Sequence, residues 1–153
     1  MAFLAFLQAN AIADLLNSSE WVFPVAECFH IVFFAVAIGS IMVVDLRLLG
    51  LAFRRQTPAK LVQDTFIWTI IGLTVSILAG MVLFLSDPRM YSYNQSFRFK
   101  ITMLLIAILF HYTVHSKVTS GSGPSPAVGV MVGILSVLLW TSIVFGGLFI
   151  AFV

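Results

Sequence analysis

The fold is decided by long apolar runs, the first of which reads WVFPVAECFHIVFFAVAIGSIMVVDLRLL over residues 21–49. A helix rises about 1.5 Å per residue, so about 20 apolar residues cross a hydrocarbon core about 30 Å thick. Three further runs follow, and they predict helices at about residues 20–49, 61–86, 97–117 and 126–153. Short connections favour antiparallel neighbours. The sequence therefore predicts an all-α integral membrane protein, a four-helix up-and-down bundle forming one transmembrane domain over residues 1–153.

The composition agrees with a protein whose main partner is the lipid bilayer. Hydrophobic residues make up 61% of the chain and charged residues 9%, and the mean hydropathy is +1.10. Soluble domains are far less apolar. The net charge is +2, but the basic residues stand at the ends of the apolar runs. No basic patch for nucleic acid is present, and the single cysteine, Cys28, excludes an intramolecular disulfide.

Residues 1–17 are predicted to form an interfacial helix at the N-terminus, because apolar side chains cluster on one face opposite Asn10, Asp14 and Asn17. This segment has no Lys or Arg, which a cleavable signal peptide needs at its start. The first and third loops carry five basic residues against three in the second loop. Cytoplasmic loops are the more basic ones. We therefore expect a bacterial inner-membrane protein with both termini on the periplasmic side.

Three histidines are the candidates for chemistry. Ionisable side chains inside a membrane are costly and are functional candidates by default. At about 1.5 Å per residue from the outer interface, His30 is expected about 14 Å deep, His111 about 16 Å and His115 about 22 Å. His30 and His111 are therefore predicted to lie level with each other on diagonally opposed helices.

Such a pair could hold a metal between its imidazoles. The diagonal of a four-helix bundle is roughly 11 to 14 Å, and histidine is a regular axial ligand of haem iron. We expect a bis-histidine haem b on His30 and His111, with His115 as the second-choice ligand. A different metal, or separate hydrogen bonds from the histidines to hydroxyls and carbonyls, are the alternatives.

Glu27 precedes His30 by three residues and shares nearly the same helix face. A carboxyl group at this position suits a proton acceptor, and we assign it that catalytic role. The alternative is a structural hydrogen bond to a facing helix.

Three basic residues near helix ends are further candidates for cofactor binding. Arg47, Arg98 and Lys100 could bind haem propionates or anchor their helices in the interface. Arg47 could also pair with Asp45, two residues before it.

Small residues recur at intervals of four in three of the predicted helices. They allow membrane helices to approach closely, or they could make room for a flat cofactor. These residues are Ala35 and Gly39, then Gly72, Ser76 and Gly80, and finally Gly129 and Gly133.

Several motifs resemble a family of small, uncharacterised bacterial four-helix inner-membrane proteins over about residues 21–117. They are Trp21-x-x-Pro24-x-x-Glu27-x-x-His30, the DLRLLG sequence of residues 45–50, and Phe99-Lys100 leading to Phe110-His111. The family is distantly similar to copper-resistance-protein-D-like and cytochrome-b-type bundles, which implies haem held by paired histidines. Diheme members need four axial histidines, so three histidines allow one such haem per subunit at most.

Three functions follow as expectations. The first is a membrane b-type cytochrome that carries electrons, with quinol as donor and quinone as a second bound cofactor. The second is a transporter or metal-handling subunit with a polar pathway through Glu27 and the three histidines. The third is a cofactor-free structural or assembly protein. Because so little of the chain lies outside the membrane, we expect a homo-oligomer or a subunit of a larger membrane complex.

Overall fold

The computed structural model describes residues 14, 16, 18–120 and 125–152. The predicted interfacial helix of residues 1–17 lies outside this part of the chain, apart from Asp14 and Leu16. The described residues are helical without any strand, as predicted. The long helices are α3 (Val22–Leu48), α4 (Pro58–Ser86), α6 (Gln95–Phe110) with its continuation, and α8 (Pro126–Leu148).

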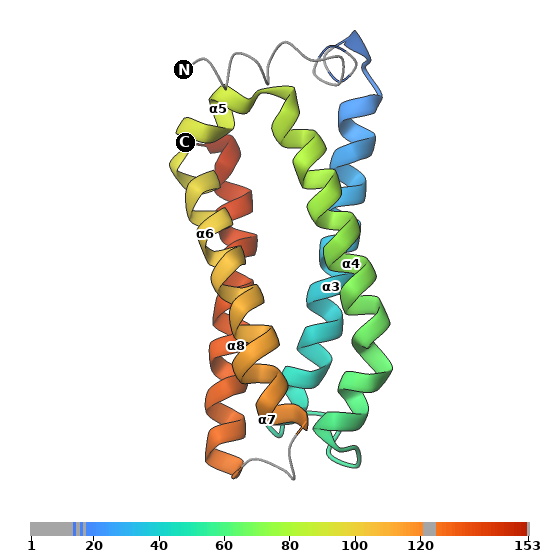
Figure 1. The fold of residues 1–153 in the computed structure, drawn as a ribbon, viewed down its shortest axis with the longest axis vertical. Helices are drawn as coiled ribbons and strands as arrows, with labels where there is room; N and C mark the ends of the chain where they lie inside the picture. Colours follow the sequence, from blue (N-terminus) through green and yellow to red (C-terminus); the bar gives the residue numbers. More distant parts are fainter. Residues whose placement is uncertain (1–13, 15, 17, 121–124, 153) are drawn as a thin grey trace.

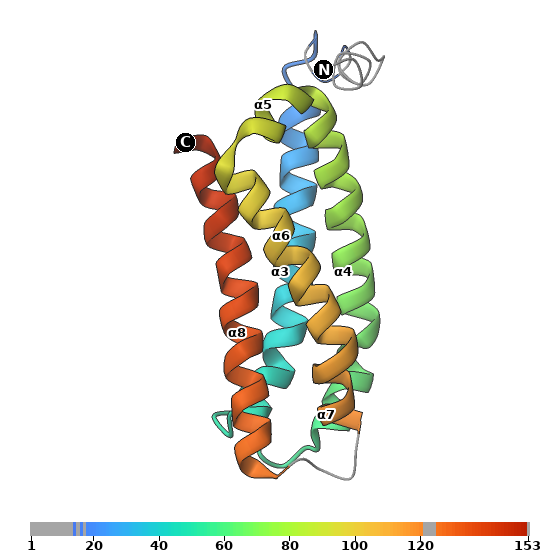
Figure 2. The same cartoon turned by 60° about the vertical axis from the view of Figure 1, so that its left-hand side comes forward.

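The long helices form an up-and-down bundle (Figures 1 and 2). The helix α3 packs against α4 and α8, and α6 packs against α8, so α3 and α6 occupy diagonal corners. One end of the bundle carries the short helix α5 (Pro88–Tyr93) and the other carries α7 (Ser116–Ser120). We call them the α5 end and the α7 end. The pair α3–α4 and the pair α6–α8 lie further apart toward the α5 end (Figure 1).

Capping residues explain two differences from the predicted helices. The helix α4 begins at Pro58 rather than at residue 61, because the Thr57 side chain accepts a hydrogen bond from the first turn and proline suits a first helical position. The helix α5 was not predicted. Asp87 caps it by accepting from the backbone N–H of Met90 at 2.9 Å.

The third membrane helix is longer than the predicted range of 97–117 and changes its winding. It starts at Gln95, capped by Asn94, and ends at Ser120. Between α6 and α7 lies the π-helical turn η1 (His111–His115). Such turns insert an extra residue into an α-helix and occur frequently at functional sites. Here the turn contains two of the three histidines.

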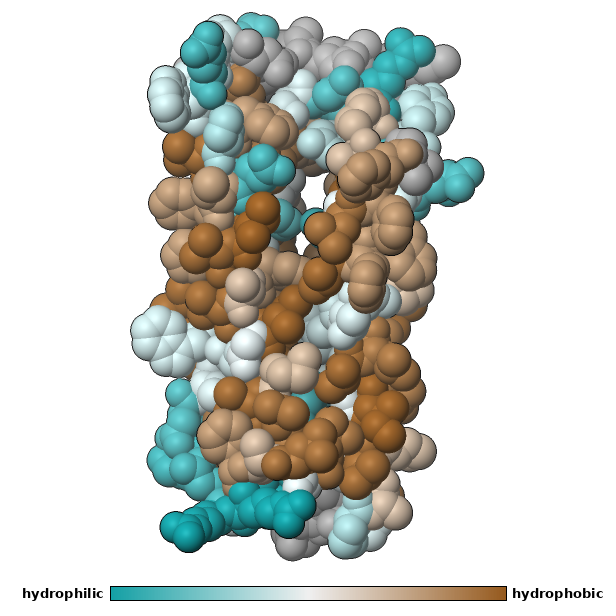
Figure 3. All heavy atoms as spheres, turned by 180° about the vertical axis from the view of Figure 1, so that it is seen from behind, coloured by the Kyte–Doolittle hydropathy of each residue, from teal (hydrophilic) through white to brown (hydrophobic). Residues whose placement is uncertain are grey.

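The core lies midway between the two ends, where six buried apolar residues among those described form one cluster. They are Ala37, Ile41, Leu73, Ala107, Trp140 and Ile143. Many other large apolar side chains are exposed, and Figure 3 shows them as an apolar band between hydrophilic ends. Four helices are long and apolar enough to cross a membrane. This surface suits lipid rather than water, so we treat the chain as an integral membrane protein.

Close helix approach explains part of the small-residue pattern. A Cβ atom added at Gly72 would lie 2.7 Å from the backbone nitrogen of Ala37 and 2.8 Å from the carbonyl oxygen of Phe33. The absence of a side chain therefore lets α4 contact the backbone of α3. Gly39, on the other hand, is exposed and would meet nothing within 4 Å.

We predict that Gly72→Ala destabilises the bundle by about 1–3 kcal/mol, the usual cost of overpacking, because α3 and α4 must move apart. Gly39→Ala is the matched control and should leave stability unchanged or slightly raised. Thermal unfolding in detergent, followed by circular dichroism, measures both. Equal stability of the two variants would contradict the close contact.

Candidate functional site

Two polar contacts cross the diagonal of the bundle between α3 and the third membrane helix. Near the α5 end, His30 meets Lys100, and near the α7 end, Asp45 meets His115. The partners are 70 residues apart in both contacts. Fifteen residues separate the two contacts along each helix, which corresponds to about 22 Å. The two diagonal helices therefore run parallel in one register, with a polar site toward each end.

This register shows that the predicted level pair of His30 and His111 is wrong. Lys100 lies level with His30, and His111 follows Lys100 by eleven residues, or about 16 Å along the helix. The depth count failed because it placed Lys100 at the outer interface, whereas this side chain reaches into the bundle. The two histidines predicted to hold haem are not brought together, so this arrangement does not fit a bis-histidine haem.

The site near the α5 end, here called the Lys100 site, comprises His30, Ser76 and Lys100. His30 Nδ1 donates to the carbonyl oxygen of Ser76 at 2.8 Å, since a carbonyl only accepts. His30 Nε2 lies 3.1 Å from Lys100 Nζ and accepts from the ammonium group. These partners fix a neutral imidazole in a single tautomer. The Ser76 hydroxyl donates to the carbonyl of His30 at 3.1 Å, which ties α4 to α3.

Packing confines this site on several sides. A Cβ atom added at Gly80 would lie 3.0 Å from His30 Cε1, so glycine there makes room for the imidazole. Phe34 stacks on the His30 ring at 6.1 Å, and Lys100 Nζ lies 5.9 Å from the centre of the Phe34 ring. Gly147 of α8 leaves space beside the Lys100 side chain.

The site near the α7 end, here called the Asp45 site, comprises Asp45, His115 and Ser136. His115 Nε2 donates to Asp45 Oδ1 at 2.9 Å, and both side chains are 1% exposed. The Ser136 hydroxyl donates to Asp45 Oδ2 at 2.7 Å. Each carboxylate oxygen therefore has a donor, and the site joins α3, η1 and α8. A buried charged pair needs such additional hydrogen bonds to offset its desolvation.

His111 extends the Asp45 site toward the core. Its ring stacks on His115 at 4.9 Å and meets the edge of Trp140 at 6.4 Å. His111 Nδ1 and Trp140 Nε1 are buried and have no hydrogen-bond partner within the described residues. His111 also borders a cavity of about 30 Å³ beside Ile41 and Thr69. A cavity of this size holds about one water molecule.

Glu27 is not part of either site. Its side chain is exposed, and within the described part of the chain it forms no ion pair. Its charge acts electrostatically both on His30 of the Lys100 site and on Tyr91 of α5. Burial raises the pKa of Tyr91, Glu27 and Asp87 raise it further, and a hydrogen bond from Ser86 opposes them. The predicted role of Glu27 as proton acceptor remains a prediction.

The three basic residues that were predicted to bind a cofactor lie in different surroundings. Lys100 lies in the bundle, whereas Arg98 is exposed on the surface of α6. Arg47 Nε donates to the carbonyl oxygen of Gln56 at 2.6 Å and so holds the loop that follows α3. Among residues 14, 16, 18–120 and 125–152, no group of three or more His, Cys, Asp or Glu side chains could hold a metal ion.

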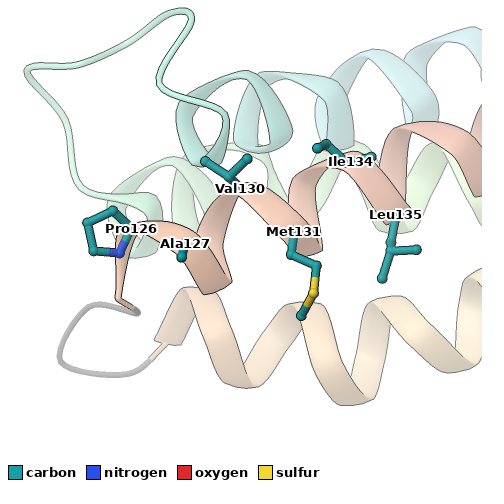
Figure 4. A pocket seen from close by; sticks show the side chains of 6 residues that line it. All are labelled: Pro126, Ala127, Val130, Met131, Ile134 and Leu135. Atoms are coloured by element: carbon teal, nitrogen blue, oxygen red, sulfur yellow. The ribbon is translucent and has the colours of Figure 1, made fainter.

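A wide apolar groove runs along the first turns of α8 (Figure 4). It is lined by Pro126, Ala127, Val130, Met131, Ile134 and Leu135. These side chains carry no ionisable group. The groove suits an apolar chain and contributes no chemistry.

Sequence reasoning missed Asp45, Ser76 and Ser136 as members of the two sites. It considered Asp45 only as a partner of Arg47 near the end of a helix. One signal was available: Asp45 is an acidic residue inside an apolar run, and it has to find a partner there. Which partner it finds depends on the register between helices.

No curated protein and no solved structure matches the chain. The distant similarity to copper-resistance-protein-D-like and cytochrome-b-type bundles therefore stays an expectation. A family model does match, over residues 21–153, and this range includes every residue of both polar sites. The chain belongs to this family, described as a family of unknown function (DUF6644).

Proposed function

We propose that the protein is a proton-linked membrane transport subunit in which Asp45 and His115 form the proton-binding pair. One observation carries the proposal. A carboxylate and an imidazole lie 2.9 Å apart inside the bundle, and each is 1% exposed. A membrane helix loses stability when it buries such groups, so their presence needs a reason beyond packing.

The chemistry of the pair suits reversible protonation. Histidine changes charge between about pH 5 and 8, the range in which cells work. When one extra proton converts His115 to an imidazolium and Asp45 is a carboxylate, the pair is neutral overall. Loss of that proton leaves a buried negative charge, and gain of another leaves a buried positive charge. Either change alters the stability of the contacts that join α3, η1 and α8.

The placement of the polar sites favours transport over electron transfer. They lie about 22 Å apart along the helices, and the apolar core with Ala37 and Trp140 fills the space between them. A polar solute cannot pass this layer without a change of helix packing. The π-helical turn at His111–His115 places the proton-binding pair at a point where the helix winding already changes. A b-type cytochrome needs paired ligands that this register does not supply.

We further propose that the α7 end faces the cytoplasm of a bacterial inner membrane. The loops at this end carry Arg54, Arg55 and Lys60 among their basic residues. Lys100 points into the bundle, so the α5 end keeps only Arg89 and Arg98 of the three basic residues in its loop. The excess of basic residues in the loops at the α7 end is therefore larger than the count from the sequence alone indicates. Quinone binding and a homo-oligomer or larger complex stay predictions.

Trp140 can report the protonation of the Asp45 site. In a variant with Trp21→Phe and Trp68→Phe, it is the only remaining tryptophan. We expect its fluorescence to fall when acidification adds a proton to the pair, because a positive charge beside the stacked rings of His111 and His115 quenches indole. Asp45→Asn should remove this transition. Asp64→Asn, at an exposed carboxylate paired with Lys60, is the matched control, and an equal loss there would contradict the assignment.

Proton movement itself can be measured in liposomes that contain a pH-sensitive dye. With a potassium diffusion potential set by valinomycin, the wild type should acidify the lumen faster than protein-free liposomes do. Asp45→Asn and His115→Gln should both reduce the rate to the protein-free level, while Asp64→Asn keeps it. A flux that survives Asp45→Asn would remove this pair from the pathway. A Soret band lost in both His30→Ala and His111→Ala would favour the cytochrome instead.

Reporter fusions test the orientation. A reporter after Thr57 should have cytoplasmic activity, and one after Val153 should have periplasmic activity, because the more basic loops stay inside. The opposite pattern would reverse the assignment of both ends.

A further inference from the structure

Lys100 is a cation inside the bundle without an acidic partner. Within the described residues, no carboxylate lies within 4.0 Å of its Nζ atom. The other buried contact between an acidic and a basic side chain joins Asp45 to His115 and does not involve Lys100. Lysine is strongly hydrated, and a desolvated ammonium group is costly unless an anion or several acceptors surround it.

Among the described residues, the contacts that this ammonium group makes are neutral ones. His30 accepts through Nε2, and the face of Phe34 lies 5.9 Å away. Because Ser76 O fixes the proton of His30 on Nδ1, the imidazole adds no charge. The side chains of the Lys100 site, namely His30, Ser76 and Lys100, therefore have a net charge of +1. An ammonium group has three N–H donors, and His30 takes one of them in the described structure.

The half of the bundle that contains this site is the more open one. Figure 3 shows an opening in the half of the molecule nearer the α5 end, bordered by hydrophilic atoms and surrounded by apolar surface. The helix pairs α3–α4 and α6–α8 separate in this half (Figure 1), and the contact from Lys100 to His30 crosses between them. Lys100 follows the start of α6 by five residues, which corresponds to about 8 Å of helix.

We propose that the Lys100 site binds the carboxylate of a long-chain amphiphile such as a fatty acid, whose tail lies along the apolar helix surfaces. The remaining N–H donors of Lys100 match the two oxygens of a carboxylate. A single positive charge is balanced by one negative charge, whereas a phosphate dianion would leave an excess. The depth of Lys100 along α6 places the carboxylate of the fatty acid below the membrane interface and its tail in the hydrocarbon core. This site is independent of proton binding at Asp45.

Oleate is the probe for this site. Binding of radiolabelled oleate to the purified protein in a neutral maltoside detergent should saturate at one per chain. Lys100→Met keeps the side-chain length and removes the charge, and it should weaken binding about tenfold or more, since a charge-assisted contact is lost. Lys60→Met is the matched control, because Lys60 is exposed and paired with Asp64. It should bind oleate as the wild type does.

Competition on the wild type keeps the test independent of variant folding. Unlabelled oleate should displace the label, while oleyl alcohol, acetate and inorganic phosphate at the same concentration should not. Displacement by oleyl alcohol would show that the charge is not recognised. Displacement by acetate or phosphate would identify a soluble anion as the occupant. Either result, or full binding in a folded Lys100→Met variant, overturns the proposal.

Discussion

The contact between Asp45 and His115 is the constraint on which the arrangement of the bundle depends. Apolar helix surfaces in lipid pack against one another in many registers with similar energy, because lipid tails are as apolar as leucine. A buried carboxylate has far fewer choices. Asp45 has to meet His115 and Ser136 at once, and this requirement aligns α3, η1 and α8 at the α7 end.

The contact between His30 and Lys100, at the α5 end, differs from the Asp45 site in its burial and its charge. His30 and Lys100 share the 70-residue offset of Asp45 and His115, so both contacts support one register. The Asp45 site is fully buried, and both oxygens of its carboxylate accept hydrogen bonds. The Lys100 site lies where the helix pairs separate, and its positive charge has no acidic partner among the described residues. One end is therefore suited to a proton and the other to an anion.

The two proposals fit one physical scheme without depending on each other. An apolar core that contains Trp140 separates the polar sites, so neither group can exchange with the other in this packing. The close approach of α4 to α3 at Gly72 packs these two helices tightly against each other. The π-helical turn belongs to the other helix pair, where the winding changes.

The sequence by itself determined the membrane class, the four helices and the approximate ends, because hydropathy and capping residues act over a few turns of one chain. It also singled out His30, His111 and His115 as residues out of place in lipid, whereas it placed Lys100 at the outer interface. Only the tertiary structure decided which of them meet. Register between helices depends on contacts 70 residues apart, and a change of three helical turns separates a His30–His111 pair from the observed His30–Lys100 pair. The contacts of Asp45 and the lack of an acidic partner for Lys100 among the described residues follow from that register, so counting residues within each helix could not reveal them.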